Sequence, residues 1–133
     1  MKILITVPNL RLPGGVTGLY KSLNIQQKGK LEYFEVNYSN KSNTLISFFY
    51  IVLKFSFKIR HFDVLHLNPS LDKRSFLRDG LLALTAKILG KRILVYWHGW
   101  QDEFYYRVEK KWFWRLFYKL TFNCVNHQIV LAN

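Results

Sequence analysis

The chain has 133 residues, of which 50% are hydrophobic and 21% are charged, so it is long enough for one folded domain and too apolar for a disordered tail. Its single cysteine, Cys124, excludes an internal disulfide framework and fits a reducing compartment. No spacing of Cys and His residues indicates a metal site. The net charge is +12, from 20 basic and 8 acidic residues. Such a charge attracts nucleic acid, anionic lipid or phosphorylated substrates.

A transmembrane segment is not expected. The apolar run at residues 1–8 is too short for a signal peptide. The most apolar stretch, residues 45–53, is cut off by Lys54 and Lys58, well short of the roughly 20 residues that span a bilayer. Aromatic residues make up 17% of the chain, and aromatic side chains among cations are typical of a membrane surface. The composition therefore favours a peripheral membrane protein, with a merely basic protein as the alternative.

The N-terminal segment predicts a strand, a glycine turn and a helix. Residues 2–7 form a short apolar run of the kind that is buried in a parallel sheet. The loop at residues 8–15 ends in Gly14 and Gly15, which punctuate it as a turn. Residues 17–27 then predict the first helix.

The next segment predicts a second strand and helix and a third strand. Residues 31–38 alternate apolar and polar side chains, as a half-buried strand does. A polar turn is expected at residues 39–44. Residues 45–60 predict a helix with cations at its C-terminal end, where they suit the helix dipole. Residues 63–67 predict the third strand.

The second half of the chain predicts two more helices and two more strands. Residues 73–89 predict a helix that is closed by Gly90, the residue type favoured just beyond a helix end. Strands are expected at residues 92–97 and 128–131, with a long helix at residues 103–122 between them. Alternating strands and helices predict an α/β fold, a Rossmann-like parallel sheet with helices on both faces. Because the chain stops just after the last strand, we expect a fragment or one subunit of a split protein.

Three predicted loops meet at one edge of this sheet. In an open parallel sheet, ligands bind outside the C-terminal ends of the strands. The loops at residues 8–16, 68–71 and 98–101 all follow strands. The pair Gly14 and Gly15 precedes a helix, where small residues let a phosphate approach backbone N–H groups. The pattern is neither G-x-G-x-x-G nor a P-loop, which disfavours nicotinamide, flavin and P-loop nucleotide sites, and a plain turn also explains it.

Five segments together resemble the N-terminal domain of family 4 glycosyltransferases, which have the GT-B fold. They are MKILITVP, LPGGVTGLYKSL, FDVLHLNPS, GKRILVYWHGW and HQIVLAN. The resemblance covers essentially the whole chain and implies that residues 1–133 are the acceptor-side half of a GT-B architecture, with the donor-binding domain absent from the chain. It implies a retaining transfer of sugar from a nucleotide-sugar donor, without a metal or another cofactor, and a chain that is inactive alone.

The resemblance also implies roles for individual residues. The donor diphosphate would lie on Gly14, Gly15 and Val16. His98 would lie in the catalytic cleft, although a structural role is an equal alternative for a histidine at a strand end. The acceptor side would be formed by Asn68, Pro69, Ser70 and Gly99. Arg74 and Arg78 lie four residues apart on one face at the start of the third predicted helix and could meet an anionic acceptor, or they could simply face solvent.

The predicted helix at residues 103–122 has two contrasting faces. At about 100° per residue, one face is apolar and is expected to pack on the sheet; it holds Trp112, Phe113, Leu116, Phe117 and Leu120. The opposite face mixes cations with two aromatic residues and is expected to contact an anionic membrane. It holds Arg107, Lys110, Lys111, Trp114, Arg115, Tyr118 and Lys119. Burial of those aromatic residues by a missing domain or partner subunit is the alternative.

These observations leave three hypotheses. The first is the acceptor-side half of a glycosyltransferase that is cytoplasmic, peripheral at the inner membrane face, and acts on a lipid-linked or polysaccharide-precursor acceptor. The second is a non-catalytic membrane-docking or acceptor-presenting subunit of a split transferase. The third is a basic nucleic-acid-binding module, which is disfavoured because the sequence has no recognisable RNA or DNA motif.

Overall fold

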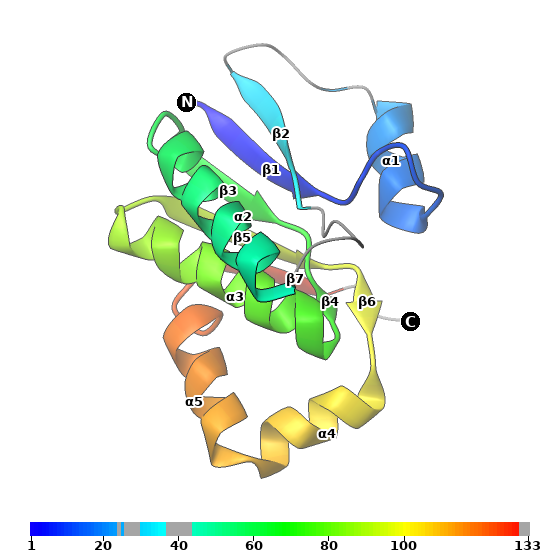
Figure 1. Ribbon diagram of the computed structural model, residues 1–133, viewed down its shortest axis with the longest axis vertical. Helices are drawn as coiled ribbons and strands as arrows, with labels where there is room; N and C mark the ends of the chain where they lie inside the picture. Colours follow the sequence, from blue (N-terminus) through cyan, green and yellow to red (C-terminus); the bar gives the residue numbers. More distant parts are fainter. Residues whose placement is uncertain (24, 26–29, 37–43, 131–133) are drawn as a thin grey trace.

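The structure is a computed structural model that describes residues 1–23, 25, 30–36 and 44–130, with the side chains of residues 44 and 45 left out (Figure 1). Its main feature is a five-stranded parallel sheet with the strand order β2-β1-β3-β5-β7. These strands are β1 (Ile3–Val7), β2 (Leu31–Glu35), β3 (Val64–Leu67), β5 (Arg92–Trp97) and β7 (His127–Val130). A separate parallel pair consists of β4 (Ser70–Leu71) and β6 (Gly99–Trp100).

Within the described residues, five helices connect the strands. They are α1 (Gly15–Leu23), α2 (Thr44–Ile59), α3 (Lys73–Ile88), α4 (Asp102–Lys110) and α5 (Trp112–Thr121). The predicted α/β architecture with a parallel, Rossmann-like sheet is therefore confirmed. No helix in the described ranges is both long and apolar enough to cross a bilayer.

Two apolar clusters lie on opposite faces of the sheet. Successive side chains of a strand point to opposite faces, and Leu4 belongs to one cluster while Ile5 belongs to the other. The larger cluster joins the sheet to α2, α3, α4 and α5, and the smaller one joins it to α1 through Tyr20. Figure 1 shows α2 and α3 side by side over the sheet, with α1 set apart from them. Helices thus cover both faces, as predicted.

Local sequence explains both ends of α3. The Asp72 side chain accepts hydrogen bonds from the backbone N–H groups of Arg74 and Ser75, both at 3.0 Å, which satisfies donors that the first helical turn leaves free. Gly90 follows the helix with a φ of +67°, a left-handed conformation that glycine adopts without strain. The predicted closure of this helix at Gly90 is confirmed.

The switch in strand order between β1 and β3 positions the candidate site. From β1 the chain runs to β2 on one side, and then crosses back so that β3 pairs with β1 on the other. In such sheets a crevice opens outside the carboxyl ends of the two strands where the order reverses. We call the region beyond Val7 and Leu67 the switch point.

Several predicted boundaries differ from the observed ones. α1 begins at Gly15, two residues before the predicted start, while the predicted end of that helix and the turn at 39–43 lie outside the described residues. Short strands β4 and β6 occupy positions that were predicted as loops. All four residues of β7 are exposed, and this strand lies at the edge of the sheet.

The largest correction concerns the predicted helix at residues 103–122. It is two helices, since Lys111 between them has extended backbone angles (φ −97°, ψ 119°). The two helices therefore do not share one helical phase. α5 packs on α3, and Trp114, predicted to face the membrane, is buried at 9% exposure while Trp112 is 73% exposed. The prediction of which face is buried was wrong.

An aromatic cluster explains why α5 packs in this way. The fully buried ring of Phe76 on α3 contacts Phe104 of α4 and Trp114 of α5, with ring centroids 5.3 and 5.9 Å apart. A side chain at Gly80, one turn further along α3, would overlap the ring of Phe117. A close approach of α3 and α5 therefore depends on glycine at this position.

Candidate functional site

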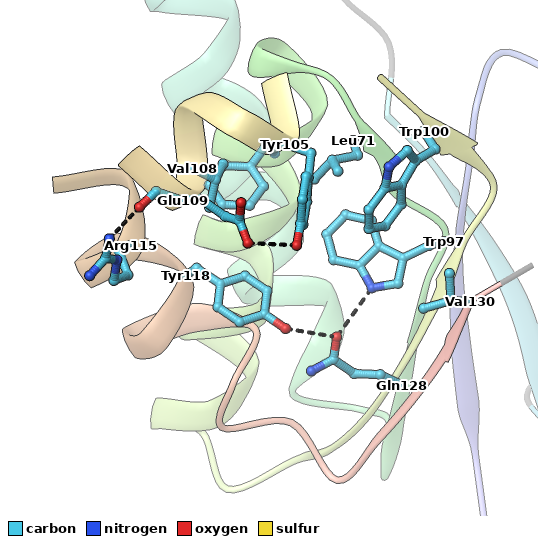
Figure 2. A pocket seen from close by; sticks show the side chains of 11 residues that line it. Leu71, Trp97, Trp100, Tyr105, Val108, Glu109, Arg115, Tyr118, Gln128 and Val130 are labelled. Atoms are coloured by element: carbon cyan, nitrogen blue, oxygen red, sulfur yellow. Dashed lines mark hydrogen bonds between the residues drawn. The ribbon is translucent and has the colours of Figure 1, made fainter. Parts of the chain in front are cut away.

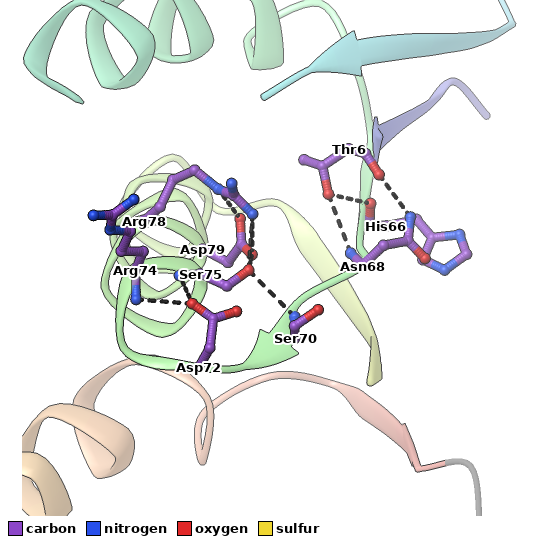
Figure 3. Close-up of polar contacts among 9 residues, drawn as sticks. All are labelled: Thr6, His66, Asn68, Ser70, Asp72, Arg74, Ser75, Arg78 and Asp79. Atoms are coloured by element: carbon purple, nitrogen blue, oxygen red, sulfur yellow. Dashed lines mark hydrogen bonds and ion pairs between the residues drawn. The ribbon is translucent and has the colours of Figure 1, made fainter. Parts of the chain in front are cut away.

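Thr6 and Asn68 join the ends of β1 and β3 at the switch point (Figure 3). The Asn68 side-chain amide donates to the Thr6 carbonyl at 2.7 Å, and the Asn68 backbone N–H donates to the Thr6 hydroxyl at 3.1 Å. The Thr6 hydroxyl in turn donates to the His66 carbonyl at 3.4 Å. Asn68 therefore has a fixed orientation, with its NH₂ group toward β1 and its side-chain oxygen free to accept.

His98 is held by that oxygen. Its Nε2 lies 2.9 Å from Asn68 Oδ1, which also accepts a hydrogen bond from the Tyr20 hydroxyl at 3.0 Å. Because Oδ1 can only accept, Nε2 carries the proton and Nδ1 is the acceptor nitrogen of the neutral ring. Burial lowers the pKa of His98 below its ordinary value of 6.5, so the ring is neutral at pH 7. The site thus holds a neutral imidazole whose tautomer is set by Asn68.

A second histidine lies behind the first. The ring of Tyr96 is 4.4 Å from that of His98 and 6.4 Å from that of His66, measured between centroids. Burial, and secondly the nearby His98, lowers the pKa of His66 to about 4. The buried Nε2 of His66 has no hydrogen-bond partner among the described residues. His66 is therefore a buried, neutral side chain on β3.

A pocket of about 340 Å³ opens beside this network, hereafter the switch-point pocket. The first turn of α1 forms one wall, with Gly14, Gly15 and Val16. The ends of β1 and β3 and the start of α3 form the rest, including Thr6, Asn68, Ser70, Ser75 and Arg78. The structure therefore brings together the predicted phosphate loop and two predicted acceptor residues, Asn68 and Ser70.

The α1 wall is suited to an anion. The Gly14 carbonyl accepts the first hydrogen bond of the helix, from Gly18 at 2.8 Å, so Gly14 caps the helix and the N–H groups of the first turn have no partner within it. No acidic side chain occupies that turn. Both glycines are exposed, which leaves the positive end of the helix dipole open to the pocket.

The opposite wall contains a buried ion pair (Figure 3). Arg78 donates to both carboxylate oxygens of Asp79 at 2.8 Å, and it also donates to the Ser75 hydroxyl at 2.9 Å. The Ser75 hydroxyl donates to Asp79 at 3.0 Å. Asp79 is fully buried, so the pair needs this bidentate geometry to compensate for its lost hydration. It holds Arg78 in one position against the pocket.

Other predicted residues lie near this pocket without lining it. Arg74 is exposed on the first turn of α3 and does not line the pocket, whereas Arg78, predicted together with it, does. Gly99 lies against Ser70, where a new Cβ would come within 3.0 Å of the hydroxyl, so its smallness allows β4 and β6 to pair. The Pro69 carbonyl accepts a hydrogen bond from the His98 backbone at 3.0 Å. Pro69, His98 and Gly99 therefore tie two loops together behind the pocket.

The residues predicted to face a membrane divide into two groups. The cations are exposed, as expected; they are Arg107, Lys110, Lys111, Arg115 and Lys119. Trp114 is buried and Tyr118 is half-buried against Phe122, so neither projects from a cationic surface. The reason is the break at Lys111, after which Trp114 faces Phe76 of α3 and Tyr118 faces Phe122 and Gln128.

Thr6 and Tyr20, which complete the hydrogen-bond network around Asn68, were not predicted from the sequence. Thr6 is the only hydroxyl residue in an otherwise apolar strand, which is the available signal for it.

Among the described residues, no group of three or more His, Cys, Asp or Glu side chains is placed to hold a metal ion. No family model, curated protein or solved structure matches this chain.

Proposed function

We propose that this chain is the acceptor-side domain of a glycosyltransferase that moves a sugar from a nucleotide-sugar donor to a lipid-linked or polysaccharide-precursor acceptor at the cytoplasmic membrane face. The observation that carries the proposal is the switch-point pocket, which is lined by the open start of α1 and by Asn68, with the neutral His98 holding Asn68 in place. The resemblance of the sequence to family 4 glycosyltransferases supports the same reaction class.

The chemistry of sugar transfer suits the two sides of this site. Negative charge develops on the diphosphate as the glycosidic bond to it breaks, and N–H groups at a helix start stabilise such charge without rearranging. Gly14 and Gly15 present those groups with no side chain in the way. Asn68 and Ser70 line the same pocket and can contact a sugar hydroxyl, while the neutral His98 holds Asn68 in place from behind the pocket. The nucleotide itself would be bound by a donor-binding domain or partner subunit.

The exposed surface of α5 supports docking at a membrane. Four large apolar side chains are between 44% and 73% exposed there: Trp112, Phe113, Leu116 and Leu120. The neighbouring cations Lys110, Lys111 and Arg115 are exposed beside them. An exposed tryptophan among apolar and cationic side chains is typical of helices that lie in the headgroup region of anionic bilayers.

This same surface favours a second candidate, a non-catalytic docking or acceptor-presenting subunit. That function needs the α5 surface and a saccharide or lipid contact, but it needs no diphosphate at α1. The two candidates therefore differ at Gly14 and Gly15.

The test is a titration of the ¹⁵N-labelled chain with pyrophosphate, the diphosphate part of a nucleotide sugar without its base. We expect the amide signals of Gly14 and Gly15 to shift. Gly15→Asp should weaken binding at least about tenfold, because its carboxylate repels the anion at the helix start.

The matched control is Gly18→Asp, which adds the same charge one turn later. A new Cβ at either glycine meets no atom within 4 Å, so neither substitution disturbs packing. Gly18→Asp should retain most of the affinity. Pyrophosphate that leaves the Gly14 and Gly15 signals unchanged would contradict the donor-facing role and favour the docking subunit.

A further inference from the structure

A larger cavity lies away from the α1 loop, between β6, α4, α5 and β7, and has a volume of about 560 Å³ (Figure 2). Five aromatic rings line it: Phe76, Trp97, Trp100, Tyr105 and Tyr118. Its polar lining residues are Glu109, Arg115 and Gln128. We call it the aromatic cavity. A cavity of this size, mostly apolar with a few placed polar groups, has the character of a small-molecule site.

The polar groups of the cavity form two short networks (Figure 2). Gln128 Oε1 accepts hydrogen bonds from Trp97 Nε1 at 3.2 Å and from the Tyr118 hydroxyl at 3.4 Å, while Gln128 Nε2 donates to the Phe122 carbonyl at 2.8 Å. The Tyr105 hydroxyl donates to Glu109 Oε1 at 2.7 Å. Both tyrosine hydrogens and the Trp97 N–H are therefore already used.

After these hydrogen bonds are made, the groups still free to bind a ligand are mainly hydrogen-bond acceptors. A phenol oxygen that donates its hydrogen can still accept, and a carboxylate has about four acceptor positions. Tyr105, Tyr118 and Glu109 thus offer acceptors toward the cavity. Arg115, which donates to the Glu109 backbone carbonyl, supplies further N–H donors at the edge.

The aromatic walls complement these acceptors. The rings of Trp100 and Tyr105 lie 5.3 Å apart between centroids with an angle of 35° between their planes. Trp100 is 50% exposed, so one part of its ring is open to a ligand. The electron-rich face of such a ring attracts the positive ends of C–H bonds.

We propose that the aromatic cavity binds a saccharide ring. The C–H face of the sugar would lie on Trp100 and Tyr105, and its hydroxyl groups would donate to Glu109 and the tyrosine oxygens. The identification of this saccharide as part of the acceptor rests on the proposed function; the binding itself does not.

Two other ligand classes fit the cavity less well. An alkyl chain would remove water from Glu109 and two phenol oxygens without supplying any donor, which is unfavourable. A phosphate would meet the carboxylate of Glu109 beside Arg115, so the cavity offers it no clear excess of positive charge. A sugar ring supplies both the apolar face and the hydroxyl donors.

The experiment follows the four tryptophan indole N–H signals of the ¹⁵N-labelled full chain. The probes are methyl β-glucopyranoside, methyl β-galactopyranoside and maltose, with 1-hexanol as the alkyl probe. We expect at least one sugar to shift the indole signals of Trp97 and Trp100, while that of Trp112 outside the cavity stays in place. Millimolar affinity is sufficient for detection.

Variants separate stacking from folding. Trp100→Ala should weaken sugar binding about tenfold, and Tyr105→Phe, which retains the ring and loses the acceptor, should weaken it several-fold. Trp112→Ala, an equally large truncation at a more exposed tryptophan, should leave binding unchanged.

Two outcomes would overturn the proposal. One is that none of the three sugars moves the Trp97 and Trp100 signals at about 10 mM. The other is that 1-hexanol moves them and the sugars do not, which assigns the cavity to an alkyl chain. Pyrophosphate shifts at Gly14 and Gly15 are measured separately, so failure of the proposed function is distinguished from failure of the sugar site.

Discussion

The switch-point pocket and the aromatic cavity are built by different means. Backbone groups and one short polar network form the first: helix-start N–H groups, the Thr6–Asn68 link and the oriented His98. Side chains from separate strands and helices form the second, where Trp100 of β6, Tyr105 of α4 and Tyr118 of α5 converge. Sheet topology brings the loops of the first site together, whereas the second depends on how α4 and α5 pack on α3. Substitutions in the helical layer should therefore affect the two sites unequally.

The largest difference is expected from Phe76→Ala. Phe76 is fully buried and contacts the rings of Phe104, Trp114, Phe117 and Phe122, so its truncation leaves a cavity that its neighbours cannot fill. We expect the free energy of unfolding to fall by about 3–5 kcal/mol, measured by urea denaturation. The control Phe49→Ala removes a ring that is 65% exposed and should change it by about 0.5 kcal/mol or less.

The milder variant Phe76→Leu tests whether the aromatic cavity can be changed without changing the switch-point pocket. It should weaken sugar-induced shifts at Trp100 while pyrophosphate shifts at Gly14 persist. Equal loss at both sites would mean that the helical layer and the switch point form one cooperative unit.

An effect of intermediate size is expected in the pH dependence of stability, because of the buried His66 on β3. The pKa of His66 is about 4 in the folded chain and near 6.5 when unfolded, so between these values the unfolded chain binds the extra proton. Stability is fully present above pH 6.5 and falls by about 3 kcal/mol as the pH drops toward 4. The lowered pKa of His98 adds to the loss in the same direction.

Carboxylates also titrate at the acid end of that range, so the measurement compares the chain with His66→Gln. Urea midpoints at pH 7.5, 5.5 and 4.5 should converge for the two proteins as the pH falls. His61→Gln, a change at an exposed histidine, should follow the unaltered chain throughout. Parallel curves for the chain and His66→Gln would show that His66 ionises freely.

The smallest effect is expected from Gly80→Ala. Its methyl group would overlap the Phe117 ring, and the shift that relieves this overlap should cost about 1–3 kcal/mol. Gly18→Ala on α1, where a Cβ meets nothing within 4 Å, should instead stabilise by up to about 1 kcal/mol. Thermal unfolding of both variants gives the sign. A stabilised Gly80→Ala protein would contradict the close approach of α3 and α5.

Much of the fold was predictable because local signals and the sheet pattern agree. The strand Arg92–Trp97 and the close of α3 at Gly90 are as predicted, since a continuous apolar run and a left-handed glycine are local features. Placing Gly14 and Asn68 in one pocket was also predictable, because the carboxyl ends of parallel strands meet at one edge. The partners Thr6 and Tyr20 were not, since hydrogen bonds across 48 and 62 residues leave no periodic trace.

The alternation of apolar runs, the glycine pair and the excess of Lys and Arg are enough to predict an α/β domain with a parallel sheet, a glycine turn near its first helix, and a net positive charge. Which side of α5 is buried, and whether Tyr118 joins aromatic rings from other elements around a cavity, depend on how the helices pack. The physical reason is that helical periodicity states which side chains share a face, but not which face meets the core. In this protein the buried face is the one whose Trp114 packs against the buried ring of Phe76, and Trp112 on the other face is exposed.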